Sequence, residues 1–473
     1  MKILHLSTSD IEHGAARAAY RLHRGLSLRK TNSQMLVRAK FSLDSTVIAD
    51  RAIRTKLAPP LSNLPLRLAP HRKRKLFSTQ WFPDVLNPKI LQIDPDLVHL
   101  HWICNGFLQI ETLAKLNKPL VWTLHDMWAF TGGCHYTQKC DRFEDRCGQC
   151  PQLKSDRSFD LSRWVWQRKA KAWKNLNLTL ISPSHWLAEQ AKKSLLFAQT
   201  PIKVIPHGLD ITKYKPVSSA IARQILELPA DKQLILFGAS PGITKDPRKG
   251  LQFLEPALQK LKPLLEQSSI ELVIFGAAEN SEPADLVFKV SYLGQFHDDV
   301  ALALVYSAAD VMVVPSIQEA FGQTASESLA CGAPVVAFNA TGLKDIVRHQ
   351  HNGYLAQPFD VDDLSRGIAW VLADKDRHQK LRENARLRAE TEFSLELQTS
   401  RHLDLYREII NHNDKKTINR EETNWNKRGA EETSAYPPST VATLGQRRRG
   451  TWSGNPTVSA SPRTGCLAIE LLK

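Results

Sequence analysis

Residues 309–336 read ADVMVVPSIQEAFGQTASESLACGAPVV, and this stretch decides the fold class. The apolar run that ends at Pro315 predicts a buried strand, and a polar loop follows it. A helix is expected from near Thr324 to Gly332, because glycine often stands just beyond a helix C-terminus. A second apolar run, Pro334–Phe338, predicts the next strand. A strand, a helix and a strand in this order indicate a parallel sheet with helices on its faces.

The same alternation occurs in both halves of the chain. The expected strands are Lys2–Leu6, Gln34–Arg38, Leu97–His101, Pro119–Leu124, Leu178–Ser182 and Ile202–Ile205 in the first half, and Gln233–Gly238, Ile270–Gly276, Val311–Pro315 and Pro334–Phe338 in the second. The expected helices include Gly14–Leu26, Gly250–Leu265, Asp298–Ala309 and Thr324–Cys331. The runs in the second half are apolar without alternation, which suits strands buried on both faces. We therefore predict two doubly wound α/β domains.

The expected domain boundaries follow from changes in composition and in the strand–helix pattern along the chain. We predict an N-terminal domain over residues 1–205 and a C-terminal domain over 206–393, with a helix at 394–411 that returns to the first domain. Residues 412–473 hold few large aliphatic side chains, so this tail is expected to be disordered.

Composition narrows the class of protein. The 473 residues are 42% hydrophobic and 23% charged, as in soluble globular proteins. No window approaches ~18 consecutive apolar residues, and the N-terminus lacks the apolar run of a secretory signal, so we expect a cytosolic chain. The formal charge of +15 favours anionic partners. Nothing in the sequence resembles a nucleic-acid reading motif, which leaves phosphorylated small molecules or an anionic membrane.

Ligands of open α/β sheets bind at the carboxyl ends of the strands. Glu319 and Gly322 lie in the loop after such a strand, and the following helix start offers free N–H groups to an anion. Glu327, in the first turn of that helix, has a carboxylate that can accept hydrogen bonds from a ribose diol. Thr324-x-x-Glu327 is equally typical of a capping box, and both interpretations stay open.

Glu319 and Glu327 are separated by seven residues, Phe321-Gly322 follows the first, and Cys331-Gly332-Ala333-Pro334-Val335-Val336 follows the second. This pattern resembles the signature of family-four retaining glycosyltransferases, which have the GT-B fold of two Rossmann-like domains facing a cleft. The resemblance covers roughly residues 1–411 and includes Val204–Asp210, although His207 stands where asparagine is usual. The opening Ser9–Arg17 and the block from Thr123 to Pro151 resemble the branch of colanic-acid-type exopolysaccharide transferases.

The resemblance implies a role for each matching residue. Glu327 would bind the ribose of a nucleotide-sugar donor, Glu319 would lie near the donor sugar, and Lys249 would bind the phosphate. The remaining donor contacts would come from His125, from Gly14 and from the segment Phe321, Gly322, Gln323 and Thr324. The family usually has an arginine after the glycine of the preceding strand, where this chain has Gly238-Ala239-Ser240. We expect Arg248 to substitute for it.

Four cysteines, Cys134, Cys140, Cys147 and Cys150, fall within 17 residues. Four thiolates can enclose a structural Zn²⁺, although only the last pair has the Cys-x-x-Cys spacing of a zinc knuckle. Reduced thiols in a loop, or an iron–sulfur or redox centre, are the alternatives. Asp94-Pro95-Asp96 and Asp360-Val361-Asp362 are interpreted as structural, so no metal or other cofactor is expected to be required for catalysis.

Residues 51–75 are basic, with leucine and proline interleaved. Such a segment suits an anionic bilayer that carries a lipid-linked acceptor, and a solvated basic loop is the alternative.

Together these features predict a retaining glycosyltransferase, cytoplasmic and in part peripheral to the plasma membrane. It would move a sugar from a UDP- or GDP-type donor to a glycan or polyprenyl-linked glycan in surface polysaccharide synthesis. A nucleotide-sugar epimerase or hydrolase of the same fold, or a non-catalytic binding protein, are the alternatives.

Overall fold

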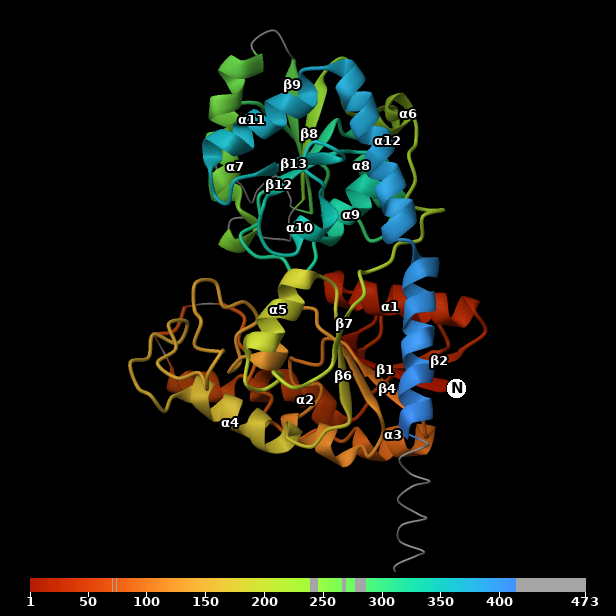
Figure 1. Cartoon of the computed structure of the whole chain (residues 1–473), viewed down its shortest axis with the longest axis vertical. Coiled ribbons are helices and arrows are strands. Elements are labelled where there is room, and N and C mark those ends of the chain that lie inside the picture. Colours follow the sequence, from red (N-terminus) through yellow and green to blue (C-terminus); the bar gives the residue numbers. More distant parts are fainter. Residues whose placement is uncertain (70, 74, 239–245, 266–268, 277–285, 414–473) are drawn as a thin grey trace, which may run out of the picture. The chain divides into compact units, whose positions relative to one another are not determined.

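The computed structural model describes residues 1–413 except positions 70, 74, 239–245, 266–268 and 277–285. The segment Ala239-Ser240, which replaces the expected arginine, and the predicted tail beyond residue 413 therefore lie outside the described residues. Two parallel sheets dominate the described chain (Figure 1). We call each sheet with its covering helices a lobe, the N-lobe for the first and the C-lobe for the second.

The N-lobe sheet has seven strands in the order β3-β2-β1-β4-β5-β6-β7. Their bounds are β1 (Lys2–Ser9), β2 (Asn32–Ala39), β3 (Val47–Ala49), β4 (Leu97–Leu100), β5 (Leu120–Thr123), β6 (Leu178–Ser182) and β7 (Ile202–Val204). The helices are α1 (His13–Leu28), α2 (Ile53–Ser62), α3 (Asn87–Ile93), α4 (Leu161–Trp173) and α5 (His185–Lys193). All strand pairs are parallel, as the crossover pattern predicted.

The C-lobe sheet has six parallel strands in the order β10-β9-β8-β11-β12-β13. Their bounds are β8 (Gln233–Gly238), β9 (Ile270–Phe275), β10 (Lys289–Tyr292), β11 (Val311–Val314), β12 (Val335–Phe338) and β13 (Gly353–Ala356). The helices are α6 (Ser219–Ile225), α7 (Leu251–Leu261), α8 (Asp299–Ala308), α9 (Gln323–Ala330), α10 (Leu343–Ile346), α11 (Val361–Leu372) and α12 (Lys375–Glu392).

Both faces of the C-lobe sheet are buried. Met312 and Val314 of β11 pack on the face that α8, α9 and α12 cover, while Val311 and Val313 pack on the face that α7 and α11 cover. This double burial explains the continuous apolar runs in the sequence.

The chain crosses between the lobes twice, and the two crossings lie side by side. The N–H of Leu209 donates to the carbonyl of Phe393, and the N–H of Leu395 donates to the carbonyl of Leu209, both over 2.8 Å. Residues 395–413 then form a helix that packs beside α1 on the N-lobe sheet, where Tyr406 is fully buried (Figure 1).

Three short strands, β3, β10 and β13, were not expected from the sequence. Each has only three or four residues, which is too short for an apolar pattern that would indicate a strand. Residues 53–62 of the basic segment form helix α2, on which Arg54 and Lys56 are exposed, so both interpretations of the segment stay open. None of the described helices is both long and apolar enough to cross a membrane.

Candidate active site

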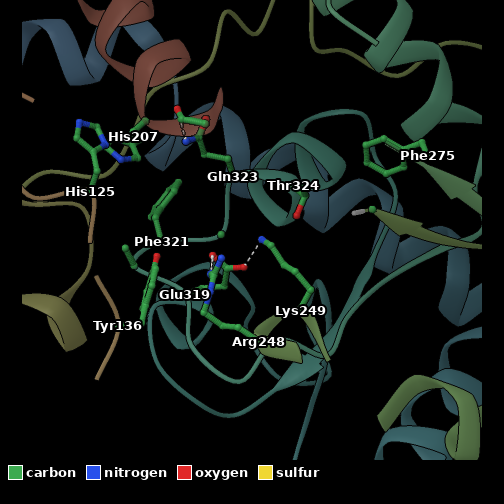
Figure 2. A pocket seen from close by; sticks show the side chains of 15 residues that line it. His125, Tyr136, His207, Arg248, Lys249, Phe275, Glu319, Phe321, Gln323 and Thr324 are labelled. Carbon is green, nitrogen blue, oxygen red and sulfur yellow. Dashed lines mark hydrogen bonds and ion pairs between the residues drawn. The ribbon is translucent and has the colours of Figure 1, made fainter. Parts of the chain in front are cut away.

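A cavity of about 330 Å³ lies between the carboxyl ends of the two sheets (Figure 2). Its lining residues are Gly14, Ala15, His125, Tyr136 and His207 on one side, and Gly238, Arg248, Lys249, Phe275, Glu319, Ala320, Phe321, Gly322, Gln323 and Thr324 on the other. Nine of the ten residues expected to hold a donor or act on it are in this lining, and Glu327 is not. The topology explains the gathering, since the loops after parallel strands meet at one edge of each sheet.

Glu319 is the acidic group of the cavity, and it is 8% exposed. Its carboxylate accepts a hydrogen bond from Lys249 Nζ at 2.6 Å and one from Ser316 Oγ at 3.1 Å. Arg248 Nη1 lies 3.8 Å away. Burial alone would raise the pKa of Glu319, but the charges of Lys249 and Arg248 outweigh it and hold the pKa below its ordinary value. The carboxylate is therefore ionised, and the three side chains together carry one net positive charge.

Arg248, which was expected to supply the second cation, lines the cavity beside Lys249. Its guanidinium stacks 4.3 Å from the ring centroid of Tyr136 and pairs with Asp246 at 2.8 Å. Both cations are held by the turn at Gly250, whose φ is +84° and where a Cβ would stand 1.8 Å from the carbonyl oxygen of Pro315. Only glycine allows this approach, so the turn fixes the cations beside the cavity.

Two helices begin at the cavity. Gly322, with φ of +110°, is the N-cap of α9 and provides no side-chain cap, so the first N–H groups of α9 are free for a ligand. The capping box that Thr324-x-x-Glu327 suggested is therefore not formed. Gln323 Nε2 donates to the carbonyl of Gly14 over 2.8 Å, which joins the start of α9 to the start of α1.

His125 is the end of a chain of buried histidines. His5 Nδ1 lies 3.0 Å from His101 Nε2, and His101 Nδ1 lies 3.2 Å from His125 Nε2. The His125 ring stacks on His207 with 5.1 Å between centroids, and His207 meets Phe321 edge-on. Burial lowers the pKa of His125 to about 4, against a smaller opposing effect of Asp126. At neutral pH His125 therefore offers a hydrogen bond to the cavity and no charge.

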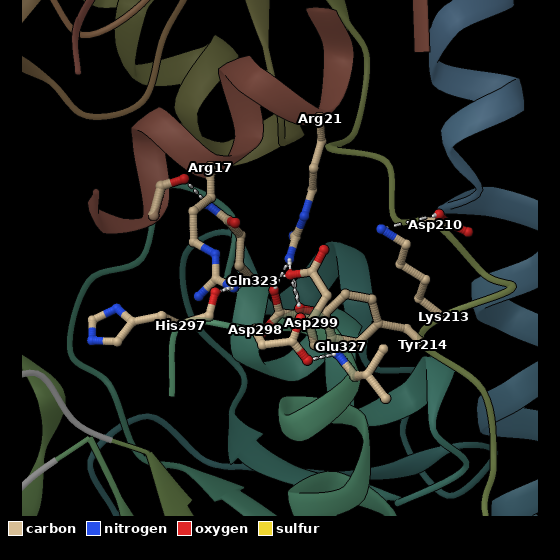
Figure 3. Close-up of polar contacts among 12 residues, drawn as sticks. Arg17, Arg21, Asp210, Lys213, Tyr214, His297, Asp298, Asp299, Gln323 and Glu327 are labelled. Carbon is tan, nitrogen blue, oxygen red and sulfur yellow. Dashed lines mark hydrogen bonds and ion pairs between the residues drawn. The ribbon is translucent and has the colours of Figure 1, made fainter. Parts of the chain in front are cut away.

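Glu327 lies beside the cavity and is held by side chains from both lobes (Figure 3). Arg21 of α1 pairs with Glu327 at 2.9 Å, and the hydroxyl of Tyr306 donates to Glu327 over 2.8 Å. Arg21 also donates to Asp299 at 3.1 Å, and Arg17 pairs with the same carboxylate at 2.9 Å. The predicted ribose contact of Glu327 stays a prediction, and it requires Arg21 to release or share the carboxylate.

Sequence reasoning missed several residues of this region. Arg17 and Arg21 stand four apart on α1, so they share one face of the helix, and this spacing was the available signal. Tyr136, which lines the cavity, was not among the expected site residues. His99 in β4 and His101, directly after its end, are two residues apart in extended chain and therefore point to one face, which could have indicated the histidine chain.

The aspartate pairs have structural partners. Asp94 pairs with Lys118 at 2.7 Å, and the side chain of Asp360 accepts the N–H of Asp363 at the start of α11. The four cysteines line a separate small cavity in the N-lobe with Phe77 and Phe143.

Two parallel α/β lobes that face a ligand cavity, with cations and helix starts at its wall, define the class of GT-B glycosyltransferases. Residues 13–213 match the model of Glycosyltransferase Family 4, and residues 220–388 match that of Glycosyl transferases group 1. An uncharacterized glycosyltransferase of Methanocaldococcus jannaschii is 30% identical over 309 residues, which are 63% of this chain and 71% of that protein. The chain therefore belongs to the family-four, group 1 glycosyltransferases.

Other relatives match a smaller part. A D-inositol 3-phosphate glycosyltransferase of Saccharomonospora viridis is 32% identical over 235 residues, which are 47% of this chain and 54% of that protein. The chain thus spans about half the length of this curated relative. Sucrose-phosphate synthase of Thermosynechococcus elongatus has a TM-score of 0.65 at 21% identity, covering 87% of this chain and 99% of that one. Anabaena HepE in complex with UDP-glucose has a TM-score of 0.58 at 19% identity, covering 86% and 100%.

Proposed function

We propose that this protein transfers a sugar, with retention at the anomeric carbon, from a nucleotide-sugar donor to a hydroxyl of a glycan or lipid-linked glycan. One observation carries the proposal: Lys249 and Arg248 converge on Glu319 in a cavity that His125 closes from the other lobe. A donor of the UDP type is supported by HepE, whose structure holds UDP-glucose in the same fold. A GDP-type donor is the alternative. The resemblance to exopolysaccharide transferases suggests surface polysaccharide synthesis as the setting.

The donor diphosphate gains charge as the bond from the sugar to phosphate breaks. Fixed cations stabilise such charge without reorganising, and Lys249 and Arg248 are positioned for this. The free N–H groups at the start of α9 would add to the stabilisation. Glu319, ionised between the two cations, would lie near the sugar ring. Glu327 would take the ribose hydroxyls once Arg21 yields.

Retention follows from departure and attack on one face of the sugar. The bond between the anomeric carbon and the phosphate oxygen breaks, and the acceptor oxygen forms its bond on the same side. The acceptor proton passes to the leaving phosphate oxygen, so no protein base is consumed. Glu319 is tied to Lys249 at 2.6 Å, which makes it a poor nucleophile for a double displacement.

A screen of nucleotide sugars by thermal shift identifies the donor, because a bound ligand stabilises the native state. Product analysis by NMR with an acceptor glycan then gives the anomeric configuration. Retained configuration supports the proposal. A donor that is turned over equally well without an acceptor would indicate an epimerase or hydrolase, and donor binding without any turnover would indicate a binding protein.

For the acceptor we propose the apolar groove of the N-lobe. This groove of about 920 Å³ is lined in large part by apolar side chains. Its basic residues Arg67, Lys154 and Arg157 are exposed, and Asp156 and Asp160 also line it. Its apolar lining residues include Leu64, Pro65, Trp81, Leu153, Phe159 and Trp164. Apolar walls with exposed cations suit a lipid chain that carries a phosphate, and they suit an anionic membrane surface.

The groove is tested by sedimentation with vesicles of phosphatidylglycerol. Binding is expected at low salt and should weaken as the salt concentration rises. Phe159→Asp should abolish it, because Phe159 is 64% exposed at the groove, while Leu387→Asp on α12, 54% exposed in the C-lobe, should not. Equal binding by both variants, or none by the wild type at low salt, would contradict this use of the groove.

A further inference from the structure

The segment 131–160 of the N-lobe joins the short helical turn at Trp128–Phe130 to α4 and contains neither a helix nor a strand. A segment of this length without regular structure needs another source of order. The sequence left three interpretations of its four cysteines open: a zinc site, reduced thiols, and an iron–sulfur or redox centre.

The fold brings the four cysteines to one cavity. One cavity of about 20 Å³ is lined by all four cysteines, Cys134, Cys140, Cys147 and Cys150. This volume can hold a single water molecule or ion. Its other walls include the aromatic rings of Phe77 and Phe143.

The backbone between the last two cysteines makes a tight turn. Cys147, Gly148 and Gln149 all have positive φ, of 55°, 100° and 46°, and this tight turn directs Cys147 and Cys150 to the same cavity. A Cβ at position 148 would stand 2.3 Å from the carbonyl oxygen of Ser158, so glycine is required there. The N–H of Gly132 donates to Cys147 Sγ at 3.2 Å, a contact that stabilises a coordinating thiolate.

A buried cation lies beside this cavity. Lys169 is fully buried, its ammonium donates to the carbonyl of Thr131 over 3.0 Å, and it lies 3.6 Å from the ring centroid of Trp128. No described carboxylate lies within ion-pair distance of Lys169, and the groups near enough to interact with its charge are Cys104, Cys147, Cys134 and Asp126. A buried charge is costly unless an opposite charge compensates it. Four thiolates around Zn²⁺ carry a net charge of about −2, and Lys169 would offset part of that charge.

From these contacts we propose that Cys134, Cys140, Cys147 and Cys150 bind one structural Zn²⁺. The neighbouring His135 is not a ligand, because Asp126 at 2.6 Å and Ser78 at 2.9 Å already occupy its ring nitrogens. The ion would hold the wall of the apolar groove, since Cys150 packs with Leu153.

The four sulfur atoms have to move closer together to bind one ion, because no three of them lie within 4.8 Å of one another. Among the described residues, only His5, His99 and His101 form a group of three whose ligand atoms lie within 4.8 Å of one another. Hydrogen bonds engage both ring nitrogens of His99, with Tyr406 and Thr123, and join His5 Nδ1 to His101, while His5 Nε2 has no hydrogen-bond partner among the described residues. Zn–S bonds of about 2.3 Å would place the sulfurs about 3.8 Å apart, so rotation of the cysteine side chains has to bring them together.

The test is the metal content of the full chain purified without oxygen. Elemental analysis should find about one zinc per chain, and replacement by Co²⁺ should give the intense thiolate-to-cobalt absorption of a four-sulfur site. Cys147→Ser and Cys150→Ser should lose both signals, while Cys331→Ser, which changes a buried cysteine of the C-lobe, should keep them.

The wild-type measurement decides the proposal even if the cysteine variants fail to fold. Chelation of the metal should also lower the melting temperature, because the ion binds only the folded segment. A chain that contains no zinc and shows no cobalt absorption after reconstitution would overturn the proposal. Iron with visible absorption would overturn it too, in favour of an iron–sulfur cluster. Both results are independent of whether the protein transfers a sugar.

Discussion

Replacing Arg21 by methionine tests whether the carboxylate of Glu327 binds the ribose of a nucleotide. In the structure the guanidinium of Arg21 forms an ion pair with the carboxylate of Glu327, which is proposed to bind the ribose. Arg21→Met removes this partner and keeps an unbranched side chain of similar reach. The hydroxyl of Tyr306 still donates to Glu327, so one carboxylate oxygen becomes free. We expect the variant to bind UDP more tightly than the wild type.

The size of the effect follows from the contact. Arg21 and Glu327 meet at 2.9 Å, and their side chains are only 8% and 7% exposed. A hydrogen bond with charged partners contributes about 1.5–3 kcal/mol. In the wild type the Arg21–Glu327 bond has to break before a ribose hydroxyl can bind the same carboxylate oxygen, and its contribution is lost. The affinity for UDP should therefore rise by about tenfold to a hundredfold in the variant, since each 1.4 kcal/mol is a factor of ten.

Isothermal titration calorimetry with UDP measures this in a double-mutant cycle. The four proteins are the wild type, Arg21→Met, Glu327→Gln and the double variant. The gain from Arg21→Met should vanish in the Glu327→Gln background, because the two residues act through one bond. Arg24→Met on the same helix is the control, as Arg24 is exposed and its nearest carboxylate is 3.5 Å away on Asp44.

Two results would refute the reasoning. If Arg21→Met weakens UDP binding as much as Glu327→Gln does, Arg21 itself contacts the nucleotide. If the gain is the same in both backgrounds, it does not pass through Glu327.

Three further predictions concern catalysis, pH and the turn at Gly250. Lys249→Met should lower kcat by about 10²–10³-fold, as expected for loss of one group that stabilises charge. Lys260→Met, which changes an exposed lysine of α7, should leave steady-state kinetics unchanged. Burial lowers the pKa of His402 to about 4, so protonation of the unfolded chain should cost the fold about 2 kcal/mol between pH 7 and pH 5. The melting temperature should fall over this range, and it should fall less in His402→Gln; equal slopes would contradict the burial of a neutral histidine. Gly250→Ala should lower both kcat and the melting temperature, while Gly294→Ala, at a positive φ with nothing within 4 Å of the added Cβ, should cost only about 1–2 kcal/mol of stability.

Much of the fold could be predicted because burial on both faces of a sheet leaves a local pattern. β11 and β12 are apolar at every position, and the sequence predicted both within a residue. β3 and β13 pair at the edges of their sheets over three or four residues, too few to show a period. Such strands form because a neighbouring strand offers hydrogen bonds, which no local pattern records.

The cavity residues could be predicted for a related reason. The loops after parallel strands meet at one edge, so Glu319, Lys249 and His125 converge once the topology is known. The Arg21–Glu327 pair joins residues 306 positions apart and depends on how the two lobes meet. The capping interpretation of Thr324 failed because Gly322 begins the helix instead, in a backbone conformation that the sequence motif does not specify.

The pair of crossings at Leu209 and Ser394 restricts how the lobes can move. Two hydrogen-bonded chain segments can bend together but resist twisting. Separation of the two lobes should therefore resemble a rotation about one axis. Arg17 and Arg21 lie on α1 of the N-lobe, and their contacts to Asp299 and Glu327 of the C-lobe would break together when the lobes part. A single movement of the lobes would thus free both carboxylates from their arginine partners.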